Sequence, residues 1–149
     1  MRPRWHLVAL CLIALAAHAG AQSAPPWTDM GGGLAGTTGI PLLEGTGDLV
    51  AGTPGSIKLS GGAPSAPCML FFSLLKVDVP FKGGTLSAFP PMATFTFVSN
   101  PSGGLLLPWS SWSSVLPPGL ELYFQMALKD AGGVNGASIS NLLQGITQP

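Results

Sequence analysis

The sequence is poor in charge. Only 8% of its 149 residues are Asp, Glu, Lys or Arg, whereas about 25% is usual in a soluble domain, and six basic residues balance six acidic ones. This composition excludes a coiled coil, a charged disordered tail and a basic nucleic-acid-binding domain, because nucleic-acid affinity depends on many cationic contacts with phosphate. We therefore expect no nucleic-acid partner.

The first residues have the pattern of a secretory signal peptide. Arg2 and Arg4 form a positive n-region, and Leu7–Ala17 forms an apolar h-region. Small residues then offer cleavage after Ala21, which we predict, or after Ala19. The apolar run is too short to cross about 30 Å of hydrocarbon as a helix. We therefore expect a signal peptide over residues 1–21, no stable membrane insertion after cleavage, and a secreted, cell-surface or periplasmic location.

Cleavage would remove both arginines, both histidines and Cys11. The remaining chain then has lysine but no arginine. It has a single cysteine, Cys68, so no internal disulfide can form. Without histidine there is no imidazole to activate a serine or cysteine nucleophile, and the ligands that zinc and copper prefer are scarce. We expect Cys68 to be a buried core residue. We predict a protein that is not an enzyme and that needs no cofactor.

Turn signals divide the remaining sequence into short segments. The chain contains 21 glycines and 15 prolines, and Gly52–Gly55 includes the Pro-Gly pair of a type II turn. Leu120–Lys129 alternates apolar with mostly polar residues, which predicts a strand with one buried and one wetted face. Cys68–Leu75 is apolar on both faces, which indicates a central strand covered on both sides. Further strands are expected at residues 48–51, 56–60, 84–88, 92–99, 105–107 and 138–143, the last of which could also be a short helical turn.

These short strands, with no long helical pattern, predict an all-β protein. The fold class we expect is a single-domain antiparallel β-sandwich, Ig-like in general architecture, and a closed barrel is the alternative. Residues 37–149 would form the sandwich domain, and the Gly/Pro-rich residues 22–36 would form a flexible leader.

Several sequence runs occur in one order along the chain. They are GLAGTTGIPLLEGTGDLVAGTPGSIKLSGGAPSA, PFKGGTL, PPGLELYFQMALKDAGG and the near-terminal Ser140-Asn141-Leu142. With these runs the chain resembles a Gly/Pro-rich β module of exported proteins from environmental bacteria, over about Trp27 to Pro149. The resemblance implies export and a β fold. The module has no established activity, so the resemblance implies no catalytic residues.

Aromatic residues are the first candidate binding site. Trp109 and Trp112 lie three residues apart with serines between them. Exposed aromatic rings beside hydroxyl groups can form a platform for a sugar or a partner protein. Residues three apart in a strand point to opposite faces, so such a platform requires a loop or bulge. The alternative is that the tryptophans cap the core. Tyr123 would join the platform or pack against a neighbouring strand.

Acidic residues are the second candidate. Carboxylates and loop carbonyls suffice for calcium, and Glu44, Asp48 and Asp78 are the candidate ligands. The ordinary alternative is that acids near turns bond to neighbouring backbone amides. A catalytic carboxylate pair of the kind that hydrolyses glycosides is a weaker hypothesis.

The function predicted from the sequence is a non-enzymatic structural or adhesive module of the cell surface or extracellular space. Its partner would be an extracellular protein or a glycan. The alternative is a carbohydrate-binding module that uses Trp109, Trp112 and Tyr123.

Overall fold

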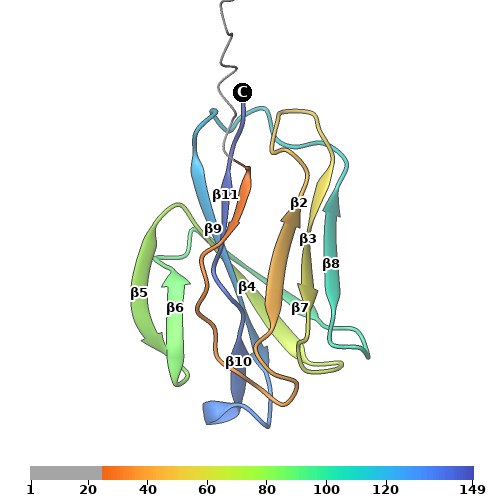
Figure 1. Cartoon of the computed structure of the whole chain (residues 1–149), viewed down its shortest axis with the longest axis vertical. Coiled ribbons are helices and arrows are strands. Elements are labelled where there is room, and N and C mark those ends of the chain that lie inside the picture. Colours follow the sequence, from red (N-terminus) through yellow and green to blue (C-terminus); the bar gives the residue numbers. More distant parts are fainter. Residues whose placement is uncertain (1–24) are drawn as a thin grey trace, which may run out of the picture.

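The computed structural model describes residues 25–149, and the predicted signal peptide lies outside them. The described chain consists of strands and one short 3-10 helix, η1 (Figure 1). In chain order the elements are β1 (Trp27–Asp29), β2 (Leu42–Thr46), β3 (Gly55–Ser60), β4 (Pro67–Ser73), β5 (Lys76–Phe81), β6 (Gly84–Ala88), β7 (Ala93–Val98), β8 (Leu105–Trp109), β9 (Glu121–Lys129), η1 (Val134–Gly136), β10 (Ala137–Ile139) and β11 (Leu143–Ile146). Within residues 25–149, no helix has the length and apolar character that crossing a bilayer requires.

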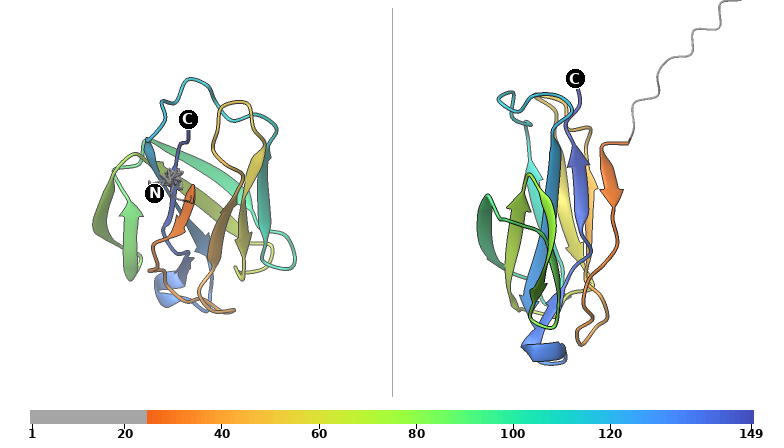
Figure 2. Two further views of the ribbon diagram at one scale, coloured as in Figure 1. Left: turned by 45° about the horizontal axis from the view of Figure 1, so that its top comes forward. Right: turned by 90° about the vertical axis from the view of Figure 1, so that its left-hand side faces the viewer.

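The strands form two packed antiparallel sheets and a hairpin. The large sheet has six strands in the order β1-β11-β9-β4-β7, with β10 also paired to β9. The small sheet has the order β2-β3-β8. The β5–β6 hairpin lies beside the large sheet, and the edge-on view in Figure 2 shows the layers. The predicted antiparallel β-sandwich is therefore confirmed.

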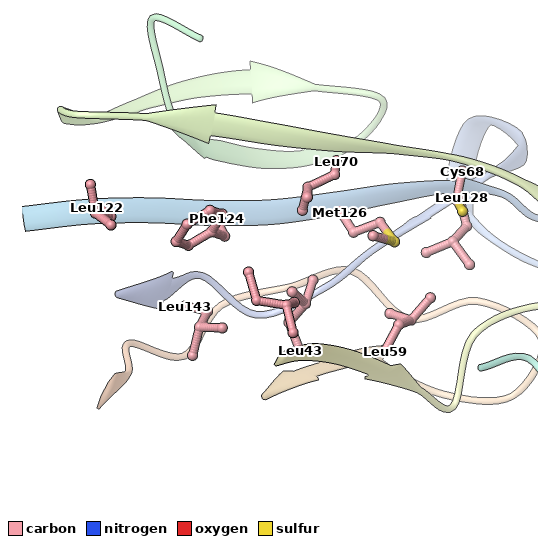
Figure 3. Close-up of a cluster of buried hydrophobic side chains, with 10 residues drawn as sticks. Leu43, Leu59, Cys68, Leu70, Leu122, Phe124, Met126, Leu128 and Leu143 are labelled. Atoms are coloured by element: carbon pink, nitrogen blue, oxygen red, sulfur yellow. The ribbon is translucent and has the colours of Figure 1, made fainter. Parts of the chain in front are cut away.

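The main core lies between the two sheets. In Figure 3, Leu70 and Met126 extend from β4 and β9 toward Leu43 and Leu59 of the small sheet. Leu43 and Met126 are fully excluded from solvent. Burying a leucine or methionine side chain contributes about 1.5–3 kcal/mol, and this core contains no disulfide, since Cys68 is free and buried.

A second apolar cluster lies on the opposite face of the large sheet. There the hairpin residues Leu86 and Ala88 cover Phe71 of β4 and Tyr123 of β9. The prediction that β4 is covered on both sides is confirmed at its centre, where Leu70 and Phe71 are both buried, but Met69 on the outer face is 36% exposed. The prediction that one face of β9 is wetted is wrong, because the hairpin leaves Tyr123 only 6% exposed.

Strand positions agree with the sequence for β3, β4, β6, β7, β8 and β9, but several expectations need correction. Residues 48–51 do not form a strand, because Leu49 adopts a left-handed conformation (φ 55°) that buries its side chain. The predicted strand at 138–143 is divided into β10 and β11. The predicted flexible leader, residues 22–36, includes β1, which pairs with β11. Strands β2 and β5 were not predicted.

Serine explains the break between β10 and β11. The backbone N–H of Ser140 donates to the Met126 carbonyl (2.8 Å), and the Met126 N–H donates to the Ser140 hydroxyl (2.9 Å). The serine side chain thus replaces a backbone carbonyl in the ladder. The following residues, Asn141 and Leu142, leave the strand path with their side chains buried.

The Asn141 side chain acts as a partner for the free edge of β2. Its Oδ1 accepts the Leu43 N–H (2.6 Å), and its Nδ2 donates to the Leu43 carbonyl (3.1 Å). The same Nδ2 donates to the Asp29 carboxylate of β1 (2.9 Å). A side-chain amide has the same donor and acceptor as a peptide group, so Asn141 supplies the bonds that a neighbouring strand would make.

The Gln125 side chain does the same for β6. Its Oε1 accepts the Ser87 N–H (2.7 Å), and its Nε2 donates to the carbonyls of Thr85 (3.1 Å) and Ser140 (3.2 Å). Gln125 is only 1% exposed, so these bonds form away from water. They fix the hairpin to the outer face of the large sheet.

Removing the Asn141 amide should strongly destabilise the sandwich. Asn141→Ala leaves the Leu43 N–H and carbonyl buried without partners, and each such group costs about 1–3 kcal/mol. Chemical denaturation should show a loss of about 2–5 kcal/mol in unfolding free energy. The control is Gln148→Ala, which removes only a bond to the nearby Ile146 carbonyl and should cost less than about 1 kcal/mol. Equal losses in the two variants would contradict the assigned role.

Asp130 joins the start of the domain to the turn after β9. Its carboxylate accepts hydrogen bonds from the Thr37 N–H (3.0 Å), the Thr37 hydroxyl and the Gly132 N–H (3.0 Å). Burial by itself raises the pKa of this carboxyl, but the bonds from Thr37 and Gly132 outweigh burial and hold the pKa below its usual range. These bonds favour the charged form of the carboxylate.

Acid should therefore destabilise the protein through Asp130. Because the pKa is lower in the folded state, the unfolded state binds the proton first as pH falls below about 4, and the unfolding free energy decreases there. Above about pH 4 the Asp130 carboxylate makes its full contribution to the unfolding free energy. Urea denaturation from pH 7 to pH 2 should show a shallower dependence for Asp130→Asn than for the native protein. Gln148→Ala, which removes no titratable group, is the control that should leave the dependence unchanged, and an identical acid slope in all three proteins would contradict this assignment.

Candidate functional site

The two predicted platform tryptophans pack against the main core between the sheets. Trp27, Trp109 and Trp112 form a series of tilted contacts, with centroid distances of 6.2 Å between the first pair and 5.1 Å between the second. The rings of Trp109 and Trp112 are inclined by 55°, and both residues are half-buried against the core. The arrangement is a packed aromatic cluster rather than a coplanar exposed platform.

Glycines make room for this cluster. A Cβ atom at Gly45 would overlap the ring of Trp27, and one at Gly55 would overlap the ring of Trp109. The Trp27 indole N–H donates to the Gly47 carbonyl (2.9 Å), whereas those of Trp109 and Trp112 are buried and find no partner among the described residues.

Tyr123 lies elsewhere, on the outer face of the large sheet beneath the hairpin. Its hydroxyl donates to the Glu121 carboxylate (2.6 Å), and Gln144 donates to the same hydroxyl (3.3 Å). Burial, followed by the bond to Glu121, raises the pKa of Tyr123. The structure therefore does not bring Tyr123 together with Trp109 and Trp112.

The tryptophan cluster predicts a stability effect. Trp109→Ala should reduce the unfolding free energy by about 2–4 kcal/mol, since it empties part of the core between the sheets. The matched change on the exposed side of the same strand, Leu106→Ala, should cost about 0.5 kcal/mol or less. Thermal denaturation measures both. Unchanged stability in Trp109→Ala together with lost binding on a glycan array would instead support the carbohydrate-binding alternative.

The predicted calcium ligands are separated. Glu44 lies on β2 opposite Lys58, Asp48 follows β2, and Asp78 lies on the β5–β6 hairpin. The Ser87 hydroxyl, and then Lys76 at 3.4 Å, hold the pKa of the exposed Asp78 carboxyl below its usual range. Among residues 25–149, no group of three or more His, Cys, Asp or Glu side chains is arranged to hold a metal ion.

Cys68 is on the core side of β4 and 5% exposed. Burial raises the pKa of its thiol, which keeps the group protonated and unreactive at neutral pH.

An apolar groove of about 580 Å³ lies on the outer face of the large sheet. Its floor is formed by Met69 of β4, Thr96 of β7 and Ala127 of β9. Phe81 of the hairpin forms one wall and packs edge-on against the buried Phe71, with ring centroids 5.6 Å apart. Groove volumes of about 300–1,000 Å³ are typical of binding sites.

The end of the groove is closed by η1. The turn after β5 approaches η1 closely, because a Cβ at Gly83 would lie 2.6 Å from Cγ1 of Val134. Asn135 of η1 and Lys82 of the hairpin turn both line the groove and both have positive φ angles, 52° and 51°. The groove is thus formed by four separate parts of the chain.

Two lysines line this groove. Lys82 and Lys129 are exposed, and the one ion pair among residues 25–149 joins two other residues, Lys76 and Asp78. No acidic residue lines the groove. The site therefore combines an apolar floor with unpaired positive charge.

Comparison with family models, with characterised proteins and with solved structures finds no match. The groove was not predicted from the sequence. Period-two alternation placed Ala127 and Lys129 on one face of their strand, but nothing in the sequence indicated that the hairpin would pack over that face.

Proposed function

We propose that the protein is a secreted, non-enzymatic structural or adhesive module that holds an extracellular protein through the groove on its outer face. The observation that carries this proposal is the apolar floor with Lys82 and Lys129 at its margin. The partner chemistry that fits is an extended apolar segment flanked by acidic residues, because the apolar side chains would cover Met69 and Phe81 while carboxylates meet the lysines.

The low charge of the whole chain supports this choice. Elsewhere on the surface the strands offer few charged groups to orient a partner, so two unpaired lysines beside one apolar groove are a specific feature. Opposite charges across an interface mainly increase the rate of association and fix the orientation of the partner.

A glycan partner is the second candidate from the sequence, but no observation favours it. Sugar platforms need an exposed aromatic face, whereas the rings of Trp109 and Trp112 are inclined and half-buried, and Tyr123 is buried.

Charge reversal at the groove tests the proposal. The probes are two fluorescent peptides with the same alternating apolar centre, one flanked by glutamates and one by lysines. The native protein should bind the acidic peptide about tenfold or more tightly than the basic one in fluorescence anisotropy. Lys82→Glu/Lys129→Glu should reverse this preference.

The control is Lys58→Glu/Lys76→Glu, which changes the net charge equally but lies outside the groove. It should keep the native preference. No binding of either peptide to the native protein, or the same response in both double variants, would contradict the proposal.

A further inference from the structure

Almost every strand edge in the described chain is protected from pairing with another molecule. Strands β1 and β10 are only three residues long, and Ile139 of β10 also exchanges both backbone bonds with Leu34. The side-chain amides described above occupy the edges of β2 and β6. Short strands and occupied edges are the usual means of preventing association between sheets.

The remaining outer strands, β5 and β8, are protected by composition or by proline. Strand β5 contains Lys76, Asp78 and Pro80, and its pairing with β6 is irregular at its start. Strand β8 contains Pro108, which has no N–H to donate. Charge, irregular pairing and proline each make the unpaired backbone groups of β5 and β8 less able to bind a strand from another molecule.

Strand β7 is the exception within residues 25–149. It pairs with β4 on one side only, and its sequence Ala93–Val98 (ATFTFV) contains no charge, proline or glycine. Apart from its pairing to β4, none of its backbone groups has a hydrogen-bond partner in the described chain. A six-residue uncharged strand, all of it aromatic or β-branched except Ala93, is a strong template for an added strand.

The side chains of this edge are also unusually exposed for their type. Phe95 faces the core side of the sheet but is 49% exposed, and Val98 on the outer face is 61% exposed. Apolar surface is therefore open on both faces of β7, and a strand added along this edge would cover both.

We propose that β7 pairs with β7 of a second copy of this chain, forming an antiparallel two-fold dimer in which the large sheets are continuous. A strand that meets its own copy places like residues near like residues, so a charge in it would repel its counterpart. The absence of charge in β7 removes that obstacle. Among residues 25–149, the other outer edges are short, occupied by side-chain amides, or interrupted by charge or proline, which leaves the β7 edge as the best template for pairing with a second copy.

Registers centred on a residue keep each residue on its own face of the sheet, and the two that overlap most of β7 are centred on Phe95 and on Thr96. Centred on Phe95, the pair places the two Phe95 rings opposite each other and Thr94 opposite Thr96. Centred on Thr96, it places Phe95 opposite Phe97 and the two threonines opposite each other. Both registers form the aromatic and threonine cross-strand pairs that stabilise antiparallel sheets.

Sedimentation of the purified protein tests the dimer. The native protein should show a reversible monomer–dimer equilibrium, and Phe95→Lys should raise the dimer dissociation constant about tenfold or more because it removes the aromatic pair and adds a charge. The matched control is Leu106→Lys on β8, an exposed leucine on the outer strand of the small sheet, which should change the constant less than about twofold.

Cysteine cross-linking identifies the register. Opposed residues in such a pair have Cα atoms about 4.5–5.5 Å apart, which lies within the range of about 4.4–6.8 Å that a disulfide spans. Phe95→Cys should cross-link in the first register or Thr96→Cys in the second, whereas Leu106→Cys should not. The protein purified from residue 22 onward, without either substitution, should not cross-link, since its one cysteine, Cys68, is buried.

Several results would overturn this inference. They are a native protein that stays monomeric up to about 1 mM, a dimer that Phe95→Lys leaves intact, oligomers larger than the dimer, or no cross-link in either β7 variant. Since Phe95 does not line the groove, Phe95→Lys should still bind the acidic peptide, so failure of the dimer is distinguishable from failure of the proposed function.

Discussion

Two buried amide side chains take the place of strands that this fold lacks. Asn141 holds Leu43 of β2, and Gln125 holds Thr85 and Ser87 of β6. The chain has few charges, and among residues 25–149 its one cysteine is unpaired, so ion networks and disulfides contribute little to joining its layers. Neutral amides do so at low cost, because all their polar atoms are bonded within the protein.

The same bonds create the candidate binding surface. Because Gln125 fixes the hairpin over β9 and β4, Phe81 stands beside the sheet as a wall and the outer face becomes a groove rather than a flat surface. Because the amides occupy the edges of β2 and β6, association is directed to β7. Stability and the choice of interaction surface therefore depend on the same side chains.

The sequence predicted the sheet class and the longer strands, since period-two alternation in β9 and the apolar run of β4 are local signals. It did not predict β1 or the hairpin's position. β1 is three residues long and is held by pairing with β11 and by a bond from Asn141, 112 residues away, and the hairpin is bonded to the Gln125 side chain. Nor did it predict the groove, whose walls come from separate segments. Tyr123 shows best where sequence prediction ends. The alternation correctly placed Tyr123 on the face of β9 that points away from the main core, but the hairpin that covers this face is brought there by tertiary packing.

Amide hydrogen exchange of the native protein tests the central claim most directly. Leu43 and Ser87 donate to side chains rather than to a neighbouring strand. If the amides replace strands, both N–H groups are as protected as that of Leu70 in β4, which is paired to a strand on each side, and the Leu43 group loses its protection when Asn141 becomes alanine while the sheet core remains protected. Exchange at Leu43 and Ser87 as fast as in an exposed loop of the native protein would contradict the account.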